Sequence, residues 1–171
     1  MLCTFGEHSY VKVFWSYAKR DDPKPHNVTL LRESFESVLG QCLGEDVDLF
    51  QDKTGLNWGD AWRKKLETEV ASSNIFVCIL SPSYFNSKMC IQELVWAIDN
   101  KVRLYPILYR ACPKGLKSNF SEKSDSHVEI LNEKSVIISE TQYEDFTKLR
   151  NEDKNSPVVL AFLDKICEQI A

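Results

Sequence analysis

The feature that most constrains this chain is a short, almost wholly apolar segment near its middle, IFVCIL at residues 75–80. A strand without a polar face suits the centre of a parallel sheet that helices cover on both sides. Four further short runs rich in β-branched and aromatic residues read as strands, at residues 10–15, 47–50, 103–109 and 136–139. Strands that alternate with helical stretches predict an α/β fold, with a five-stranded, mainly parallel sheet between two layers of helices.

The helical stretches are recognised by apolar residues at three- and four-residue spacing. Asn27 is expected to cap the first helix and Asp60 the second, because short polar side chains accept hydrogen bonds from the free amides of a first turn. A third helix is expected over residues 90–100. The last opens at Ser156-Pro157, an N-cap followed by a proline at the first helical position.

Length and composition narrow the possible functions. The 171 residues fit one domain, and a net charge of −4 argues against a nucleic-acid surface. No apolar run approaches the ~20 residues of a membrane span, and the first residues lack the pattern of a signal peptide. Six scattered cysteines without a CxxC pair, and three histidines that lie far from any cysteine pair and form no HExxH, predict a reduced, cytoplasmic protein without a metal site.

Several enzyme and nucleotide-binding classes lack their motifs here. The glycines are dispersed, with no GxxxxGK[ST] and no GxGxxG, so a P-loop or Rossmann-type phosphate cradle is not expected. No GxSxG elbow appears, which argues against an esterase. A phospho-receiver domain needs an aspartate at the end of the third strand, where this chain has Ser81-Pro82.

Polar segments follow three of the predicted strands, at the sheet edge where such folds bind ligands. They read VFWSYAKRDD from residue 13, LFQDKTGLNWGDAW from residue 49 and LSPSYFNSKMCIQEL from residue 80. In this order and spacing they resemble the FxSY box, the D-x-x-x-x-x-x-G loop and the SPxYxxSxWCxxEL segment of a TIR (Toll/interleukin-1 receptor) domain. The resemblance covers about residues 10–110, and its wording is more similar to bacterial antiphage TIR proteins than to animal receptors.

The resemblance implies a flavodoxin-like, three-layer αβα fold and, for many bacterial and plant members, cleavage of NAD⁺ at the nicotinamide–ribose bond. Glu93 stands where that family has its catalytic glutamate. One acid can suffice, because the pyridinium leaves as a neutral molecule and only the oxocarbenium-like ribose needs a stabilising carboxylate. NAD⁺ would be the substrate, with no further cofactor. The alternative is a helix glutamate that only complements the helix dipole.

The sequence departs from the family pattern at Met89. Active members often have a tryptophan four residues before the glutamate, which stacks on the base, and methionine gives a weaker contact. Trp58, after the second strand, or Trp15, in the first, is a candidate for supplying the ring instead. Packing in the core is the alternative for both tryptophans.

Other candidate substrate-binding residues lie in the loops after the first two strands. Lys19 and Arg20 stand where related proteins present a basic residue to the dinucleotide, so a contact with the pyrophosphate is expected. The alternative is that these two basic residues are solvated and only balance the charge of the acidic residues at 21–22. Ser16 and Tyr17 match the FxSY box and either contact the substrate or shape the turn.

Asp52 opens a loop to residue 59 that, in this family, gates the site and contacts the next subunit; a plain surface loop is the alternative. The chain is therefore interpreted as a single TIR domain over residues 1–171, in the family's usual arrangement the N-terminal effector domain of a longer protein. It would hydrolyse NAD⁺ to nicotinamide and ADP-ribose or a cyclic form, in antiphage immunity.

Activation is expected through TIR–TIR homo-oligomers and a sensor domain or partner outside this chain, with no direct contact to nucleic acid or membrane. One alternative is a non-catalytic TIR module that only self-associates. Another, against which the dispersed glycines count, is a nucleotide sensor or flavodoxin-type binding domain.

Overall fold

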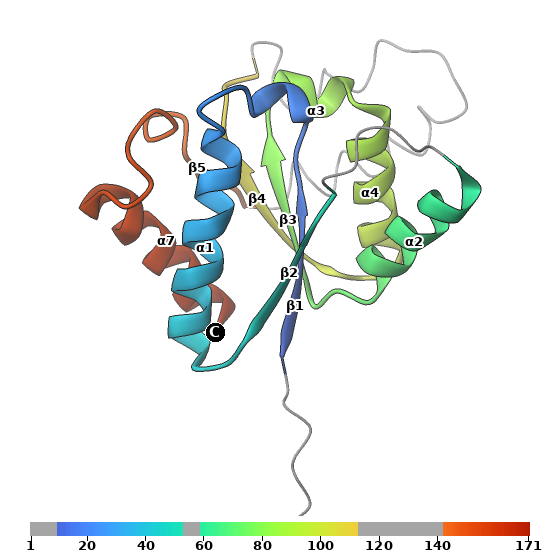
Figure 1. Cartoon of the computed structure of the whole chain (residues 1–171), viewed down its shortest axis with the longest axis horizontal. Coiled ribbons are helices and arrows are strands. Elements are labelled where there is room, and N and C mark those ends of the chain that lie inside the picture. The colour runs from blue at the N-terminus through green and yellow to red at the C-terminus, as the bar shows by residue number, and fades with distance from the viewer. Residues whose placement is uncertain (1–9, 53–58, 113–141) are drawn as a thin grey trace, which may run out of the picture.

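A computed structural model of the chain describes residues 10–52, 59–112 and 142–171. Within these residues, a five-stranded sheet has the order β2-β1-β3-β4-β5, and every neighbouring pair is parallel (Figure 1). The strands are β1 (Val11–Ser16), β2 (Val47–Gln51), β3 (Ile75–Leu80), β4 (Arg103–Leu108) and β5 (Glu144–Asp145). The predicted α/β fold with a parallel, five-stranded sheet is confirmed.

The fifth strand differs from the one expected. β5 is two residues long and pairs with Ile107 and Leu108 at the end of β4. The expected strand at 136–139 lies outside the described residues.

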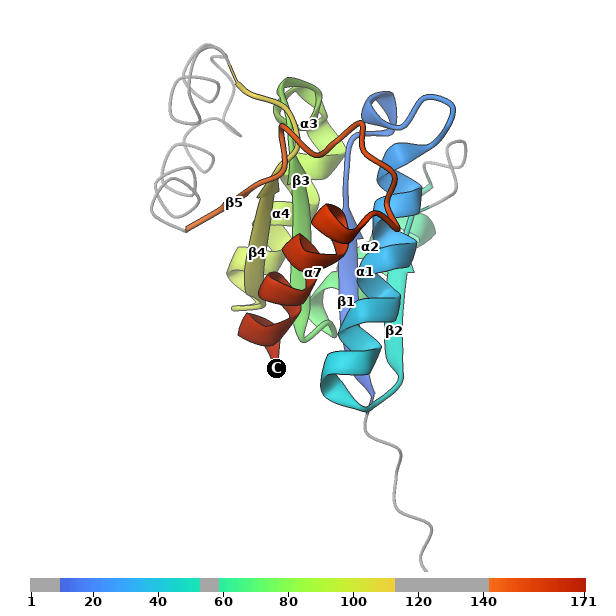
Figure 2. The ribbon, with the colours of Figure 1, turned by 90° about the vertical axis from the view of Figure 1, so that its left-hand side faces the viewer.

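Helices cover both faces of the sheet. α1 (Asn27–Leu43) and α7 (Pro157–Ile170) lie side by side on one face, as Figure 2 shows, and α2 (Asp60–Ala71) and α4 (Lys88–Asp99) lie on the other. A short helix, α3 (Pro82–Asn86), follows β3 directly at the carboxyl end of the sheet. Every residue of β3 is buried, as expected of a central strand covered on both sides.

The predicted N-caps of α1 and α2 are wrong by one position. Asn27 and Asp60 are the first helical residues rather than the caps. Two amides at the start of α1 bind a residue earlier in the chain: Asp22 Oδ1 accepts hydrogen bonds from the backbone N–H of Val28 at 2.9 Å and of Thr29 at 3.3 Å. Asp22 therefore ties the loop after β1 to the first turn of α1.

The carboxyl ends of β1, β2 and β3 meet at one edge of the sheet, near α3 and the start of α4 (Figure 1). This arrangement brings together the three segments that the sequence analysis singled out. Among the described helices, none is both long and apolar enough to cross a membrane.

Candidate active site

Glu93 lies on the buried face of α4, with only 5% of its surface exposed. Cys90 and Ala97, its neighbours at helical spacing, and the adjacent Leu94 are also buried, so the helix carries a carboxyl group among apolar residues. A glutamate that served only the helix dipole would be expected at the surface, because unpaired glutamates are rarely buried. The burial of Glu93 therefore argues against that alternative.

A hydroxyl group from the end of β1 contacts this carboxyl group. Ser16 Oγ donates a hydrogen bond to Glu93 Oε2 at 2.6 Å, and the hydroxyl of Tyr84 lies 3.0 Å from the same Ser16 Oγ. The FxSY and SPxY segments thus meet at Glu93, although they are far apart in the sequence.

Burial also changes the acidity of Glu93. Burial, the largest cause, and the charge of Asp52 raise the pKa of this carboxyl, the hydrogen bond from Ser16 and the charge of Lys19 lower it, and the net result is a rise from 4.5 to about 8. A carboxyl group with a strongly shifted pKa beside a pocket is a candidate for catalysis.

A pocket of about 150 Å³ opens onto Glu93 at the carboxyl ends of β1 and β2. Residues from β1, the loop after it, the end of β2 and the start of α4 line it: Trp15, Tyr17, Lys19, Asp52, Ser87, Met89, Cys90 and Glu93. Ligand pockets usually measure about 300–1,000 Å³, so this one is smaller than a typical complete ligand site.

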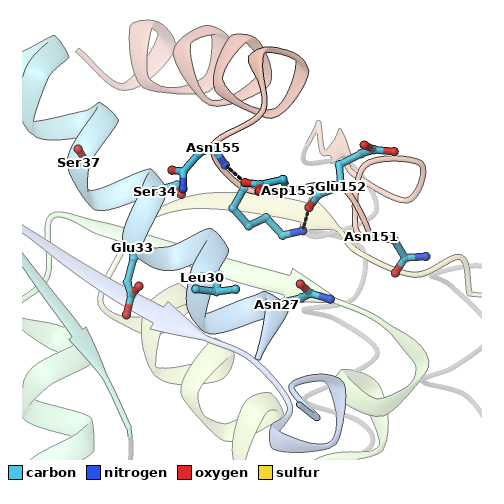
Figure 3. A pocket seen from close by; sticks show the side chains of 10 residues that line it. Asn27, Leu30, Glu33, Ser34, Ser37, Asn151, Glu152, Asp153 and Asn155 are labelled. Atoms are coloured by element: carbon cyan, nitrogen blue, oxygen red, sulfur yellow. Dashed lines mark hydrogen bonds between the residues drawn. The ribbon is translucent and has the colours of Figure 1, made fainter. Parts of the chain in front are cut away.

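A larger hollow of about 470 Å³ lies elsewhere, between α1 and the segment before α7 (Figure 3). Polar side chains such as Glu33, Ser34 and Asn155 line it, and a hydrogen bond from Lys154 Nζ to the backbone carbonyl of Glu152 runs along its wall. It contains none of the candidate site residues. Residue chemistry rather than size therefore identifies the smaller pocket as the candidate active site.

Most residues named from the sequence come together at this pocket. The Lys19 ammonium lies 3.7 Å from Asp52 Oδ2, and the Tyr17 hydroxyl accepts a hydrogen bond from Gln51 Nε2 at 2.8 Å. Met89 also lines the pocket, in the first turn of α4. Arg20 is exposed and does not line it.

Of the two tryptophans proposed as replacements for the missing ring, the structure describes only Trp15. Trp15 lines the pocket but is only 1% exposed and packs against Phe35, with ring centroids 5.4 Å apart. The ring of Trp15 is therefore packed mainly in the hydrophobic core. Trp58 lies outside the described residues, as does the loop from 53 to 58.

The acidic residues at 21–22 are not solvent-exposed ion-pair partners of Lys19 and Arg20. Asp21 is buried, accepts a hydrogen bond from the Ser81 hydroxyl and lies 3.7 Å from Arg110 Nε. Asp22 bonds the start of α1, as described above. Asp21 therefore ties the loop after β1 to the end of β3, a role that the sequence did not predict.

A sequence model of the TIR domain matches residues 13–156. The chain belongs to the TIR domain family. The fold agrees: the TIR domains of the activated Roq1 resistosome, which directly recognises the pathogen effector XopQ, match it with a TM-score of 0.65 at 18% identity, over 94% of this chain and 99% of that one. The TIR domain of the Toll-related receptor TRR-2 from Hydra magnipapillata matches with a TM-score of 0.52 at 17% identity, over 91% of this chain and 96% of that one.

One relative carries an enzymatic name. A protein of Brachypodium distachyon, named probable 2′ cyclic ADP-D-ribose synthase BdTIR, is 28% identical over 67 residues. The matched part is 39% of this TIR chain and 30% of that protein. The match therefore spans less than a third of the relative.

The raised pKa of Glu93 predicts a pH-dependent effect on stability. Because folding raises this pKa, the native state binds a proton more tightly than the unfolded chain between pH 4.5 and about 8, and the carboxyl increasingly destabilises the fold as pH rises through that window. Glu93→Gln should increase the free energy of unfolding by roughly 2–4 kcal/mol at about pH 9 and by little at about pH 5. Urea denaturation at both pH values measures this, and an equal effect at the two pH values would contradict it.

Proposed function

We propose that this TIR domain is an NAD⁺ glycohydrolase that cleaves the nicotinamide–ribose bond with Glu93. The observation that carries the proposal is a buried carboxyl group that opens onto a pocket at the carboxyl edge of the sheet and accepts a hydrogen bond from the hydroxyl of Ser16. Membership of the TIR family and the similarity to a relative named as a cyclic ADP-ribose synthase support it.

The chemistry requires one negative charge at the right place. As the bond between ribose C1′ and the pyridinium nitrogen breaks, its electron pair moves to nicotinamide, which leaves neutral and needs no general acid. The ribose becomes an oxocarbenium-like cation, and the carboxylate of Glu93 stabilises it in a site shielded from water. Water, or a hydroxyl of the same molecule, then forms the new bond to C1′ and releases its proton to the solvent, which gives ADP-ribose or a cyclic product.

The cationic substrate also favours the reactive form of the enzyme. Empty, the pocket disfavours an ionised Glu93, whose pKa burial raises to about 8. A pyridinium in van der Waals contact supplies the opposite charge that lowers such a pKa. Substrate binding would thus promote the ionisation that the reaction needs, with no external cofactor or metal.

The remaining pocket residues have roles in binding. Lys19, at the pocket edge, would contact the pyrophosphate of NAD⁺. Met89 would provide an apolar, polarisable contact to the nicotinamide ring in place of the tryptophan of other members. Tyr17 and Asp52 border the same space and would position the ribose.

We further propose that the enzyme is a cytoplasmic effector of antiphage immunity that self-associates through TIR–TIR contacts, under control of a sensor outside this chain. The wording of its three motifs supports this setting, and the similarity to TIR domains of a resistosome supports self-association. The small volume of the pocket also favours a site completed by a second copy.

The test is to incubate the protein with NAD⁺ over a range of concentrations and to quantify nicotinamide by chromatography, with light scattering in parallel. Nicotinamide release should rise faster than linearly with protein concentration, because assembly would complete the site. A specific activity that stays constant from nanomolar to high micromolar protein would contradict activation by assembly. Complete absence of nicotinamide would instead favour a non-catalytic self-association module, the alternative to which Met89 points.

A further inference from the structure

Tyr84 lies behind the candidate catalytic residues rather than in the pocket. It belongs to α3, is fully buried, and does not line the pocket. Its hydroxyl lies 3.0 Å from Ser16 Oγ and 3.4 Å from the backbone carbonyl of Cys90. Tyr84 has no role in the mechanism proposed above.

The number of protons in this cluster fixes the direction of its hydrogen bonds. A serine hydroxyl has one proton, and the 2.6 Å contact from Ser16 Oγ to Glu93 Oε2 uses it when the glutamate is ionised. Ser16 Oγ can then only accept from Tyr84, whose buried hydroxyl keeps its proton because burial raises its pKa well above 10. The tyrosine proton points to Ser16 at 3.0 Å rather than to the Cys90 carbonyl, whose longer distance of 3.4 Å makes a weaker bond.

The backbone of Tyr84 is held at the start of α3, and its hydroxyl also contacts the Cys90 carbonyl of α4, the helix that carries Glu93. The backbone amide of Tyr84 donates to Ser81 Oγ at 3.0 Å at the start of α3, and Ser81 in turn donates to the buried Asp21. The tyrosine is therefore anchored to the end of β3 and to the loop after β1.

We propose that Tyr84 is a positioning residue for the NAD⁺ cleavage proposed above, which acts through a one-way chain of hydrogen bonds from Tyr84 to Ser16 to Glu93. By occupying the acceptor site of the serine, Tyr84 directs the only proton of Ser16 toward the carboxylate. Chains of hydrogen bonds polarise one another, so the serine becomes a better donor than it would be alone. The chain therefore stabilises the ionised form of Glu93, the form that the reaction needs.

Other groups near Glu93 do not replace this function. Asp52, at the end of β2, raises the pKa of Glu93, and Lys19, after β1, lowers it. The thiols of Cys78 in β3 and Cys90 in α4 are buried with raised pKa values, so they stay neutral. Of these neighbours, Lys19 is the only one that favours the carboxylate, and it does so less than the hydrogen bond from Ser16.

The test is a titration of the Glu93 carboxyl by NMR, with ¹³C-labelled glutamate in the free protein and Glu93→Gln to assign the signal. Tyr84→Phe should raise the titration midpoint by about half a pH unit, and Ser16→Ala by about one unit, because a hydrogen bond to the charged form is weakened or lost. In the Ser16→Ala background, Tyr84→Phe should add no shift, since the tyrosine acts through the serine. Tyr105→Phe is the matched control, because its hydroxyl also lies 3.4 Å from a backbone carbonyl, far from Glu93.

A shape-conserving variant covers the case in which Tyr84→Phe does not fold. Replacement of Tyr84 by 3-fluorotyrosine keeps the hydroxyl and makes it a stronger donor, so the midpoint of Glu93 should fall. The proposal would be overturned if the Glu93 midpoint stayed unchanged or moved the opposite way in Tyr84→Phe or in the 3-fluorotyrosine variant. It would also be overturned if Tyr84→Phe gave the same shift in the Ser16→Ala background. The titration needs no substrate, so its outcome is separate from whether the chain cleaves NAD⁺; where it does, the pH profile of kcat/KM should move with the midpoint.

Discussion

Replacing Glu93 with glutamine should reduce NAD⁺ cleavage by at least about 100-fold, the effect of removing a principal electrostatic stabiliser of a transition state. Glutamine has nearly the same shape and can still accept the hydrogen bond from Ser16, so the pocket should keep its geometry. What is lost is the negative charge next to the oxocarbenium-like ribose. The measurement is kcat/KM for nicotinamide release, with circular dichroism to show that the fold is retained.

Glu36→Gln provides the matched control for this substitution. Glu36 also lies on a helix, but its carboxylate faces Arg32 at 3.5 Å on the surface of α1, away from the pocket. Because this ion pair lies away from the pocket and the Glu36 side chain is 37% exposed, the control should have wild-type activity. Retention of most activity by Glu93→Gln, or an equal loss in both variants, would refute the assignment of Glu93.

The opposite effects expected for Glu93→Gln separate catalysis from structure. A glutamate kept for packing would lower both activity and stability when replaced. Here the substitution should strongly reduce activity and yet increase stability at high pH, because the ionised carboxyl is a buried charge whose main direct partner is a neutral hydroxyl. The free-energy cost of burying this charge is offset by the rest of the core, here the packed layers on both faces of the sheet.

The sequence predicted the elements with strong local patterns. The bounds of β3, 75–80, agree with the structure residue for residue, because an apolar run bounded by polar turns leaves little freedom. The predicted cap of α7, Ser156, is confirmed, but that of α1 failed for a physical reason: Asp22 reaches the amides of Val28 and Thr29 across a turn, whereas cap rules consider only the residue next to the helix. β5 is too short, at two residues, to produce a periodic pattern.

The candidate site was predictable in part. Ser16, Lys19, Asp52 and Met89 could be assigned to one place because parallel strands bring their carboxyl ends together, and the structure places them around Glu93. Tyr84 could not be assigned a role, since its partner Ser16 is distant in sequence and the contact exists only in the folded chain.

The structural role of Asp21 could not be predicted for a similar reason. Its charge suggested a solvated partner for the neighbouring basic residues, but folding buries it against the Ser81 hydroxyl. Short-range charge patterns do not report which acidic side chain a loop turns inward.

The pH dependence of kcat/KM tests the central claim most directly, because only an ionised Glu93 can stabilise the developing cation. This parameter reports the ionisation of the free enzyme, in which the pKa of Glu93 is raised to about 8. Below that value, kcat/KM should rise about tenfold for each pH unit, and it should level off above it. The residual activity of Glu93→Gln should lack this rise. A wild-type profile that is flat between about pH 5.5 and about pH 9 would contradict the account, since no buried carboxyl would then control the reaction.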